Sequence, residues 1–406
     1  MMMEYYLRDA VRDGTLEVRL PGGRRVTAGD GSGPPITVAV SSRLWAARIA
    51  AFPETALGEA YMAGAVNFER GDIYDLLALA GRNLPYRRPA HPPSAFIRWL
   101  HDLSSTRNAR RAAGRNARHH YDVPLEIYRR FLDADLQYSC AYFERPDLSL
   151  EEAQDAKQRH IAAKLLLAPD HRVLDIGCGW GGLARRLALE ADVCVDGVTL
   201  SPAQLDEAQR RAAAMGLAGR VRYSLTDYRD TVGPYDRIVS VGMFEHVGRP
   251  NYRAYFQQVH RLLADDGVAV IHSIGRFDGP GITQPWLARH IFPGGYIPAL
   301  SEALAAVERA GLIVADVEIL RLHYAETLAA WRQRFAAARD EIREIAGERF
   351  CRMWEFYLAA SEVGFRWAGH MVFQLQLAKR LDTVPLTRGY IGEGERHYAE
   401  RRRIAA

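Results

Sequence analysis

The stretch DHRVLDIGCGWGGLARRLALEADVCVDGVTLS, residues 170–201, decides the fold of this 406-residue chain. Its first part, HRVLDIG, predicts a short buried strand that ends in a glycine-rich turn. Leu183 and Leu187 then mark one face of a helix, and VCVDGVTL predicts the next strand. A strand, a helix and a second strand in this order predict parallel strands with the helix crossing one face of the sheet.

The same alternation continues after this stretch. We expect a helix at 202–215, strands near 221–225, 236–241 and 267–274, and a mostly helical segment at 324–380. The helix between the last two strands is well marked, because its apolar residues recur at helical spacing. These residues are Tyr252, Tyr255, Phe256, Val259, Leu262 and Leu263. The sequence therefore predicts an α/β fold with a doubly wound parallel sheet and helices on both faces.

Composition places the chain among ordinary globular proteins, with 48% apolar and 25% charged residues. A net charge of +4 does not indicate a nucleic-acid partner. All but three of the 53 basic residues are arginines, the exceptions being Lys157, Lys164 and Lys379. Arginine binds phosphate and carboxylate groups with its planar fork. Codon bias in a GC-rich genome is the alternative explanation for its abundance.

The positive charge is concentrated in residues 82–118, which contain nine arginines and a single acid, Asp102. Four prolines interrupt regular structure there, and Phe96, Ile97, Trp99 and Leu100 add apolar surface. Basic and apolar residues together are typical of an element that lies on anionic lipid. A solvated linker between domains is the competing interpretation, and the aromatic residues lack the spacing of a nucleic-acid stacking platform.

The remaining features are consistent with a reducing compartment. The four cysteines stand far apart, which indicates neither a zinc site nor a disulfide framework, so we expect no metal. The first residues, MMMEYYLRDAVRDG, carry acids and arginines where a signal peptide needs an apolar stretch. No apolar run approaches the length of a membrane span.

Residues 1–85 predict a small mixed α/β domain, with alternation at 16–20 and an extended run, ITVAV, at 36–40.

The glycine-rich turn is the first candidate for chemistry, because ligands of doubly wound sheets bind beyond the carboxyl ends of the strands. Asp175, Gly177, Gly179 and Gly181 form the pattern D-x-G-C-G-x-G. Glycines allow close approach of a ligand to the backbone. An acid ahead of them would repel a pyrophosphate, so the pattern favours a nucleotide-like cofactor with a positive charge.

Several blocks in one order carry a resemblance to a known family. They are YDVPLEIYRRFLDADLQYSCAYFE, VLDIGCGWGG, DGVTLSPAQ, DRIVSVGMFEHVG, VIHSIGR and HIFPGGYIPALSE. The chain resembles the cyclopropane-fatty-acyl-phospholipid synthases, which are S-adenosylmethionine-dependent methyltransferases related to the mycolic acid cyclopropane synthases. The resemblance covers about residues 119–380, and GEAYMAG at 58–64 resembles the N-terminal domain of longer bacterial members.

This resemblance implies a Rossmann-like methyltransferase sheet with helical additions and a domain order. The expected parts are a lipid- or membrane-associated domain at 1–85, a basic linker at 86–118, a catalytic domain at 119–381 and a tail at 382–406. It also implies how S-adenosylmethionine is bound. Tyr138 and Ser139 would meet the methionine end and Asp175, Gly177, Gly179 and Gly181 the path past the loop, while Thr199, Leu200 and Gln204 would meet the ribose and Asp227 and Tyr228 the adenine.

The resemblance further implies a bound bicarbonate that acts as a base. Its expected holders are Cys140, Glu245, His272, Ile274 and Tyr324. Strand alternation independently places His272 and Ile274 on one face near the carboxyl end of a strand. An alkene attacks the sulfonium methyl group in a dry pocket, and the base then removes a proton from the resulting carbocation to close the ring.

The expected function is therefore methylene transfer to the double bond of an unsaturated phospholipid acyl chain. The expected partners are an anionic membrane surface and, by resemblance, a second copy of the chain, with no nucleic acid. The expected location is cytoplasmic, peripheral on the inner face of the membrane. Alternatives are a related methyltransferase that makes a methyl-branched or methylene-bearing chain, a non-catalytic lipid-binding relative, and methylation of RNA, for which the sequence shows no stacking aromatics.

Overall fold

The computed structural model describes residues 4, 7–8, 10–83 and 123–405. It forms two compact units, each built from separated segments of the chain. The first unit contains the described residues of Met1–Ala95 together with Thr283–Pro293 and Ala325–His370, and the second contains the rest. The expected domain boundaries at 85, 118 and 381 stay predictions. The basic linker at 86–118 lies outside the described residues.

The first unit contains a small sheet with strand order β2-β1-β3-β4. The strands are β1 (Leu16–Arg19), β2 (Arg25–Ala28), β3 (Ile36–Val40) and β4 (Val66–Arg70). Its helices are α2 (Arg43–Ala51), α3 (Pro53–Met62), α4 (Ile73–Asn83), α12 (Pro285–His290), most of α14 (His323–Ala337), α15 (Arg339–Ala346) and α16 (Glu348–Trp367). As expected from the alternation, Leu16 and Val18 are buried. Trp286 of α12 packs against Phe356 of α16, with 4.5 Å between the ring centres.

The second unit is built on a seven-stranded sheet with order β10-β11-β9-β8-β5-β6-β7. The strands are β5 (Arg172–Ile176), β6 (Cys194–Thr199), β7 (Val221–Leu225), β8 (Tyr235–Val241), β9 (Leu263–Arg276), β10 (Ile313–Leu320) and β11 (His370–Ala378). The strands from β9 to β7 pair in parallel, and β10 pairs with β11 antiparallel. The predicted doubly wound α/β fold is confirmed.

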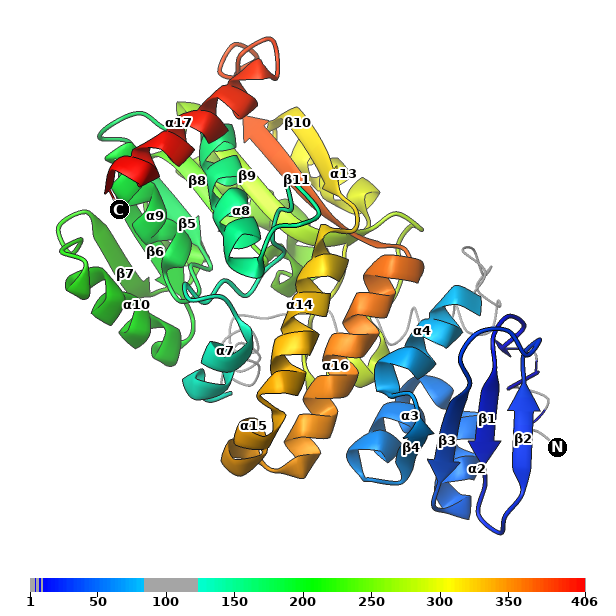
Figure 1. The fold of residues 1–406 in the computed structure, drawn as a ribbon. Coiled ribbons are helices and arrows are strands. Elements are labelled where there is room, and N and C mark those ends of the chain that lie inside the picture. Colours follow the sequence, from blue (N-terminus) through cyan, green and yellow to red (C-terminus); the bar gives the residue numbers. More distant parts are fainter. Residues whose placement is uncertain (1–3, 5–6, 9, 84–122, 406) are drawn as a thin grey trace. The chain divides into compact units, whose positions relative to one another are not determined.

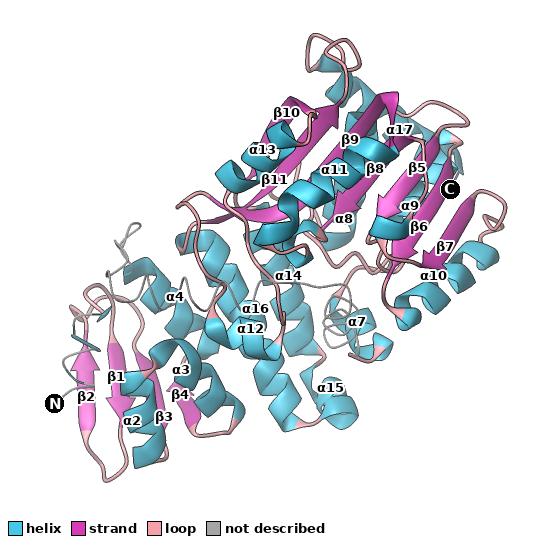
Figure 2. Cartoon of the chain, turned by 180° about the vertical axis from the view of Figure 1, so that it is seen from behind, coloured by secondary structure: helices cyan, strands magenta, loops and turns pink. Residues whose placement is uncertain are grey.

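Helices cover both faces of this sheet. On one face lie α8 (Leu150–Leu165), α9 (Gly182–Ala191), α10 (Pro202–Ala214) and α17 (Gly389–Ala405), which share an apolar core with β5 and β6. On the other face lie α11 (Tyr252–Leu262) and α13 (Leu300–Arg309). Figure 1 shows α8, α9 and α17 in front of the strands, and Figure 2 shows α11 and α13 on the opposite side. A short helix, α7 (Leu125–Phe131), precedes them.

The segment 324–380 is mostly helical, as expected, but its last part is a strand. α14, α15 and α16 are followed by β11, which is inserted between β9 and β10. The run HMVFQLQLA is buried on both faces of the sheet, so it lacks the alternation of a half-exposed strand. Its periodicity therefore did not separate it from a buried helix.

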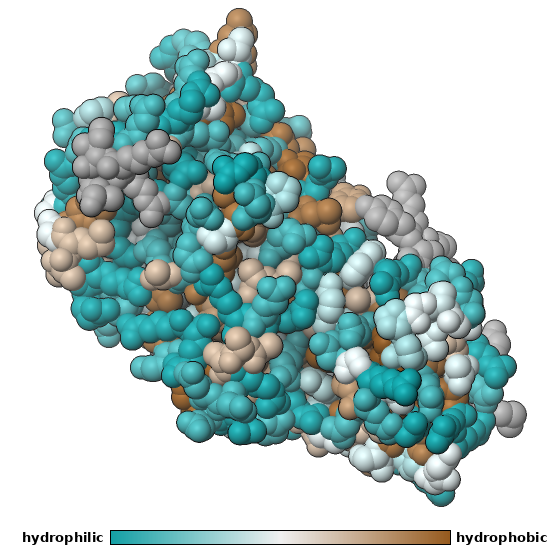
Figure 3. Space-filling view, viewed as in Figure 1, coloured by the Kyte–Doolittle hydropathy of each residue, from teal (hydrophilic) through white to brown (hydrophobic). Residues whose placement is uncertain are grey.

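No helix in the described part of the chain is long and apolar enough to cross a bilayer. The surface drawn in Figure 3 is mostly hydrophilic, with apolar side chains in separate small patches.

Candidate active site

A cavity of about 320 Å³ opens at the carboxyl ends of the parallel strands in the second unit. Its walls come from the loops after β5, β6, β7 and β8 and from the strip Leu136–Ser139. Ten of the eleven residues expected at the cofactor line it. They are Tyr138, Ser139, Asp175, Gly177, Gly179, Thr199, Leu200, Gln204, Asp227 and Tyr228. The cavity therefore lies where the topology rule for doubly wound sheets predicts a ligand site.

The glycine-rich loop needs its glycines for two different reasons. Gly177, Gly179 and Gly181 all have positive φ angles, of 80°, 53° and 78°. A Cβ atom added to Gly179 would meet no atom of the described residues within 4 Å, so this position leaves open space for a ligand. A Cβ on Gly181 would lie 2.5 Å from the hydroxyl of Tyr223, which donates a hydrogen bond of 2.7 Å to the Gly181 carbonyl. Gly181 therefore packs behind the loop and is not among the described lining residues.

Asp175 lies near the end of β5 and is 2% exposed. Burial raises the pKa of its carboxyl group to about 7, and the charge of Lys157 opposes this shift. Its Oδ2 is buried, and no described residue offers it a hydrogen bond. Because an unpaired buried carboxylate oxygen is costly, this atom fits a ligand that brings a donor or a positive charge.

The loop after β6 and the start of α10 form the floor of the cavity. The Thr199 hydroxyl donates to Oε1 of Gln204 over 2.9 Å, and the Ser201 side chain caps α10 by accepting from the Gln204 backbone. These contacts fix the orientation of the Gln204 side-chain amide, whose oxygen accepts the hydrogen bond from Thr199. Its nitrogen remains a donor for a ligand.

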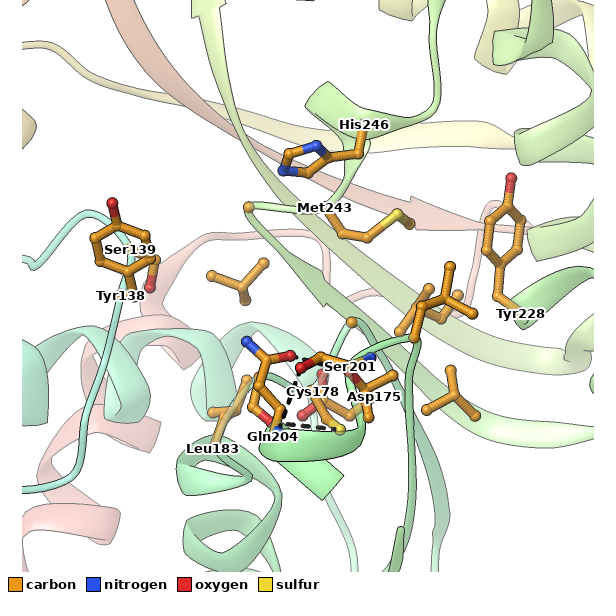
Figure 4. A pocket seen from close by; sticks show the side chains of 18 of the residues that line it. Tyr138, Ser139, Asp175, Cys178, Leu183, Ser201, Gln204, Tyr228, Met243 and His246 are labelled. Carbon is orange, nitrogen blue, oxygen red and sulfur yellow. Dashed lines mark hydrogen bonds between the residues drawn. The ribbon is translucent and has the colours of Figure 1, made fainter. Parts of the chain in front are cut away.

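The loop after β7 forms one end of the cavity. Oδ1 of Asp227 accepts from Nε of Arg229 over 2.8 Å, and Oδ2 accepts from Nη2 over 2.5 Å. This pairing fixes the carboxylate beside Tyr228, whose ring packs edge-on against Tyr255. Figure 4 shows Tyr228 at one end of the cavity and Tyr138 with Ser139 at the other. The cavity is thus elongated and has a tyrosine at each end, accompanied by the Asp227 carboxylate at one end and by the Ser139 hydroxyl at the other.

None of the five residues expected at the base is among the residues that line this cavity. The backbone N–H of Ile274 donates to Oε1 of Glu245 over 2.6 Å. Oε2 of Glu245 is buried without a hydrogen-bond partner among the described residues. Burial raises the pKa of this carboxyl group to about 7.

His272 is buried on β9, two residues before Ile274. Burial, together with the charge of Lys157, holds its pKa well below the usual value, so the imidazole is neutral. Its Nδ1 lies 3.1 Å from Nε2 of Gln374 on β11. Cys140 and Tyr324 are also buried, and the Cys140 thiol donates to the carbonyl of Ala141.

Sequence reasoning missed several residues of this region. Met243 and His246 follow β8 and face the glycine-rich loop across the cavity (Figure 4). Burial lowers the pKa of His246 to about 4, so this ring is also neutral. Both residues lie in the quoted block DRIVSVGMFEHVG, and the rule that ligands meet residues after a strand would have found them. Lys157 and Gln374 carry no local signal beyond the rarity of lysine in this chain.

Comparison with known proteins identifies the family. Residues 108–375 match the family model described as mycolic acid cyclopropane synthetase. The chain is 38% identical to cyclopropane-fatty-acyl-phospholipid synthase of Escherichia coli, over 80% of this chain and 83% of that protein. It is 36% identical to a Pseudomonas putida protein named "Probable fatty acid methyltransferase", over 82% of this chain and 85% of that protein.

A solved structure supports the same assignment. The mycolic acid cyclopropane synthase CmaA1, complexed with SAH and CTAB, is 34% identical and superimposes with a TM-score of 0.62. The match covers 65% of this chain and 97% of that structure. The glycine-rich loop, the elongated cavity and these matches agree. The chain belongs to the mycolic acid cyclopropane synthetase family of S-adenosylmethionine-dependent methyltransferases.

Proposed function

We propose that the chain transfers a methylene group from S-adenosylmethionine to the double bond of an unsaturated phospholipid acyl chain and forms a cyclopropane ring. The name of the Escherichia coli relative supports the phospholipid substrate and the ring product. The observation that carries the proposal is the state of Glu245. Its carboxylate is buried and accepts a hydrogen bond from the Ile274 N–H, and its other oxygen has no hydrogen-bond partner in the described part of the chain. The neutral His272 lies two residues before Ile274 on β9.

The cavity fits S-adenosylmethionine in shape and polarity. When bound, this cofactor supplies an electrophilic methyl group. Tyr138 and Ser139 would hold its methionine end, and Asp227 and Tyr228 would hold its adenine. Gly179 leaves room for close approach to the backbone. Oδ2 of Asp175, which has no hydrogen-bond partner among the described residues, suits a donor or a positive charge. The remaining expected binding residues, Gly177, Gly181, Thr199, Leu200 and Gln204, complete or support the loops between the two ends.

Ring closure requires a base that takes a proton from the transferred methyl group. We propose that Cys140, Glu245, His272, Ile274 and Tyr324 hold bicarbonate for this purpose. Oε2 of Glu245 can accept a hydrogen bond from the hydroxyl group of a small anion and so orient that anion. The Ile274 N–H is already engaged by Glu245, so it would have to be shared with the anion. A neutral His272 can donate from the nitrogen that does not face Gln374.

Product analysis tests this proposal. Lipids from a host that expresses the chain should contain acyl chains one CH₂ heavier than their precursors, with the upfield proton signals of a cyclopropane ring. Heavier chains without ring signals would overturn the ring product. They would establish the second candidate, a methyltransferase that makes methyl-branched or methylene-bearing chains, which the name of the Pseudomonas putida relative supports.

A non-catalytic lipid-binding role makes a different prediction. Such a relative would not bind S-adenosylmethionine, so calorimetry with this ligand separates it from both enzymes. We further propose peripheral association with an anionic membrane on its cytoplasmic side, as a homodimer. The charge of residues 82–118 supports the membrane contact, and these residues lie almost entirely outside the described part of the chain.

A further inference from the structure

Helix α8 buries two of the three lysines in a chain that otherwise uses arginine. Lys157 is 1% exposed and Lys164 is 0% exposed. A buried arginine carries five N–H donors that need partners, whereas an ammonium group carries three. Lysine therefore suits a confined site with few acceptors, and the acceptors that Lys157 finds lie on the wall of the cavity.

The contacts of Lys157 are specific. Its Nζ donates to Oε1 of Gln137 over 2.6 Å and to Oγ of Ser139 over 2.9 Å. From the same helix, the amide of Gln154 donates to the carbonyl of Ser139 over 2.9 Å. Gln137 and Ser139 both belong to the strip that lines the cavity. Side chains of helix α8 thus bind both the side chains and the backbone of this strip.

These bonds determine the polarity of Ser139. An ammonium group can only donate, so Oγ of Ser139 accepts from Lys157 and its own proton is left for another partner. The cavity wall therefore offers a hydroxyl donor with a positive charge directly behind it. Both features favour an anionic group on the ligand side.

The charge of Lys157 persists at neutral pH. Burial lowers the pKa of the ammonium group to about 8, and the carboxylate of Asp133 opposes the shift. The group is therefore mostly protonated at pH 7. In S-adenosylmethionine the one anionic group is the carboxylate of the methionine part.

We propose that Lys157 is a positioning residue that, through Ser139, makes this end of the cavity selective for the carboxylate of the amino-acid part of the cofactor. The inference rests on the proposed use of S-adenosylmethionine. Lys157 lies behind the cavity wall and does not line the cavity itself, so its role goes beyond the expected binding residues.

Calorimetry with two ligands tests the proposal. S-adenosylhomocysteine carries the amino-acid part, and 5′-methylthioadenosine lacks it. Lys157→Met removes the charge and the donors but keeps the length of the side chain. We expect its affinity for S-adenosylhomocysteine to fall about tenfold or more, as for loss of a charge-assisted hydrogen bond. Its affinity for 5′-methylthioadenosine should be unchanged.

Lys164→Met is the matched control. Lys164 is equally buried on the same helix, but it contacts Glu318 and Asp316 and not the strip. Its substitution should leave the ratio of the two affinities at the wild-type value even if it lowers the melting temperature. A change in that ratio as large as that of Lys157→Met would overturn the proposal.

Ser139→Ala keeps the proposal testable if Lys157→Met does not fold. It should reproduce the selective loss, and the double variant should lose no more than either single variant. Equal weakening of both ligands by Lys157→Met, or no selective loss in Ser139→Ala, would overturn the role of Lys157. A wild-type chain that binds neither ligand would instead overturn the proposed function, and this inference with it.

Discussion

Glu245 and Ile274 are joined by a hydrogen bond of 2.6 Å from the backbone N–H of Ile274 to the carboxylate of Glu245. This bond ties the turn after β8 to the carboxyl end of β9. The backbone carbonyl of Glu245 also accepts from the N–H of Tyr296 over 2.9 Å. Glu245 is thus fixed at both its side chain and its backbone, while one carboxylate oxygen finds no hydrogen-bond partner among residues 10–83 and 123–405.

We expect Glu245→Gln to lower turnover by about 100-fold or more and to leave cofactor affinity largely intact. Glutamine keeps an oxygen that can accept from Ile274, so the local structure should survive. It loses the carboxylate that would orient the base, an effect typical of general acid–base groups. Turnover assays and calorimetry with S-adenosylhomocysteine measure the two quantities separately.

The control for this variant is Glu302→Gln. Glu302 also accepts from a backbone N–H, that of Ala299, but it does so at the start of α13 and lines no part of the described cavity. It should change turnover only a few-fold. Cofactor affinity that falls as much as turnover in Glu245→Gln would place Glu245 in the cofactor site instead.

The difference in the free energy of unfolding between wild type and Glu245→Gln should depend on pH. The folded pKa of Glu245 is about 7, above its ordinary value of 4.5, so the folded state binds more protons between these values. The stability that this group contributes is therefore fully present below about pH 4.5 and lost as the pH rises through 7. Glutamine does not titrate.

We therefore expect the free energy of unfolding of Glu245→Gln, relative to wild type, to rise between pH 5 and pH 8. The rise should be on the order of 3 kcal/mol, since one pKa unit corresponds to about 1.4 kcal/mol. Urea unfolding of both proteins at the two pH values measures it. A difference that does not change with pH would show that Glu245 is not protonated in the folded state near neutrality.

Two alanine substitutions in the glycine-rich loop should affect different properties, one mainly the stability of the fold and the other mainly the affinity for the cofactor. Gly181→Ala places a Cβ against Tyr223 at a positive φ, so we expect a loss of a few kcal/mol in the free energy of unfolding. The methyl group of Gly179→Ala meets no neighbour in the part of the chain that the structure describes, so the substitution should cost about 1 kcal/mol of strain. Its methyl group enters the open space, so cofactor affinity should fall at least tenfold. Melting curves and calorimetry distinguish the pair, and equal loss of stability in both would contradict the assignment.

The sequence predicted the sheet, its helices and most of the cavity because these depend on local patterns. Apolar runs followed by glycines predict parallel strands with loops at one edge, and that edge holds Asp175, Thr199 and Asp227. The fate of β11 was not predictable in this way, since a strand buried on both faces has no alternation. Its position beside β9 brings Gln374 to His272, a contact between residues 102 positions apart.

Pairings across the fold were also beyond the sequence. The hydrogen bond between Ile274 and Glu245 and the burial of Lys157 depend on how α8 and the strands pack. The composition did single out Lys157 in one respect, because the chain has only three lysines. The expected role of Gly181 illustrates the opposite limit: the loop pattern cannot distinguish a glycine that faces a ligand from one that makes room for a tyrosine.

His160 of α8 should stabilise the second unit in a pH-dependent way. Its two ring nitrogens each lie 2.6 Å from a carboxylate oxygen, one of Glu318 and one of Glu395 on α17, and its ring stacks on Tyr142. Burial lowers the pKa of His160, but the hydrogen bonds to the two glutamates together raise it by more than burial lowers it. The folded pKa therefore lies above the ordinary 6.5. The stability that it contributes is present below pH 6.5 and lost as the pH rises through the folded pKa.

His160→Phe keeps a ring against Tyr142 and removes both bonds. We expect it to lower the free energy of unfolding by about 2 kcal/mol at pH 6, and by less at pH 9. His171→Phe is the control, because burial, with the charge of Arg237, lowers the pKa of His171, so its difference from wild type should change with pH in the opposite direction. Chemical unfolding across this range checks both, and a His160→Phe deficit that grows with pH would refute a charged His160.

If residues 82–118 contact the membrane, binding to vesicles of anionic phospholipid should weaken steeply with salt. These residues carry nine arginines and one acid, a net charge of about +8. Each basic residue near an anionic surface contributes about 1 kcal/mol, and salt screens this attraction beyond about 10 Å at 0.1 M. Replacing Arg110, Arg111 and Arg115 by serine should therefore lower vesicle affinity by about two orders of magnitude.

The control replaces three exposed arginines of the second unit, Arg222, Arg253 and Arg261, and changes the net charge equally. It should bind vesicles nearly as well as wild type, because affinity should depend on where the charge lies and not on its total. Cosedimentation with phosphatidylglycerol vesicles at several salt concentrations compares the three proteins, and phosphatidylcholine vesicles provide the uncharged reference. Binding that is insensitive to salt, or equal losses in both triple variants, would return residues 82–118 to the role of a solvated linker. The membrane contact would then have to come from another part of the chain.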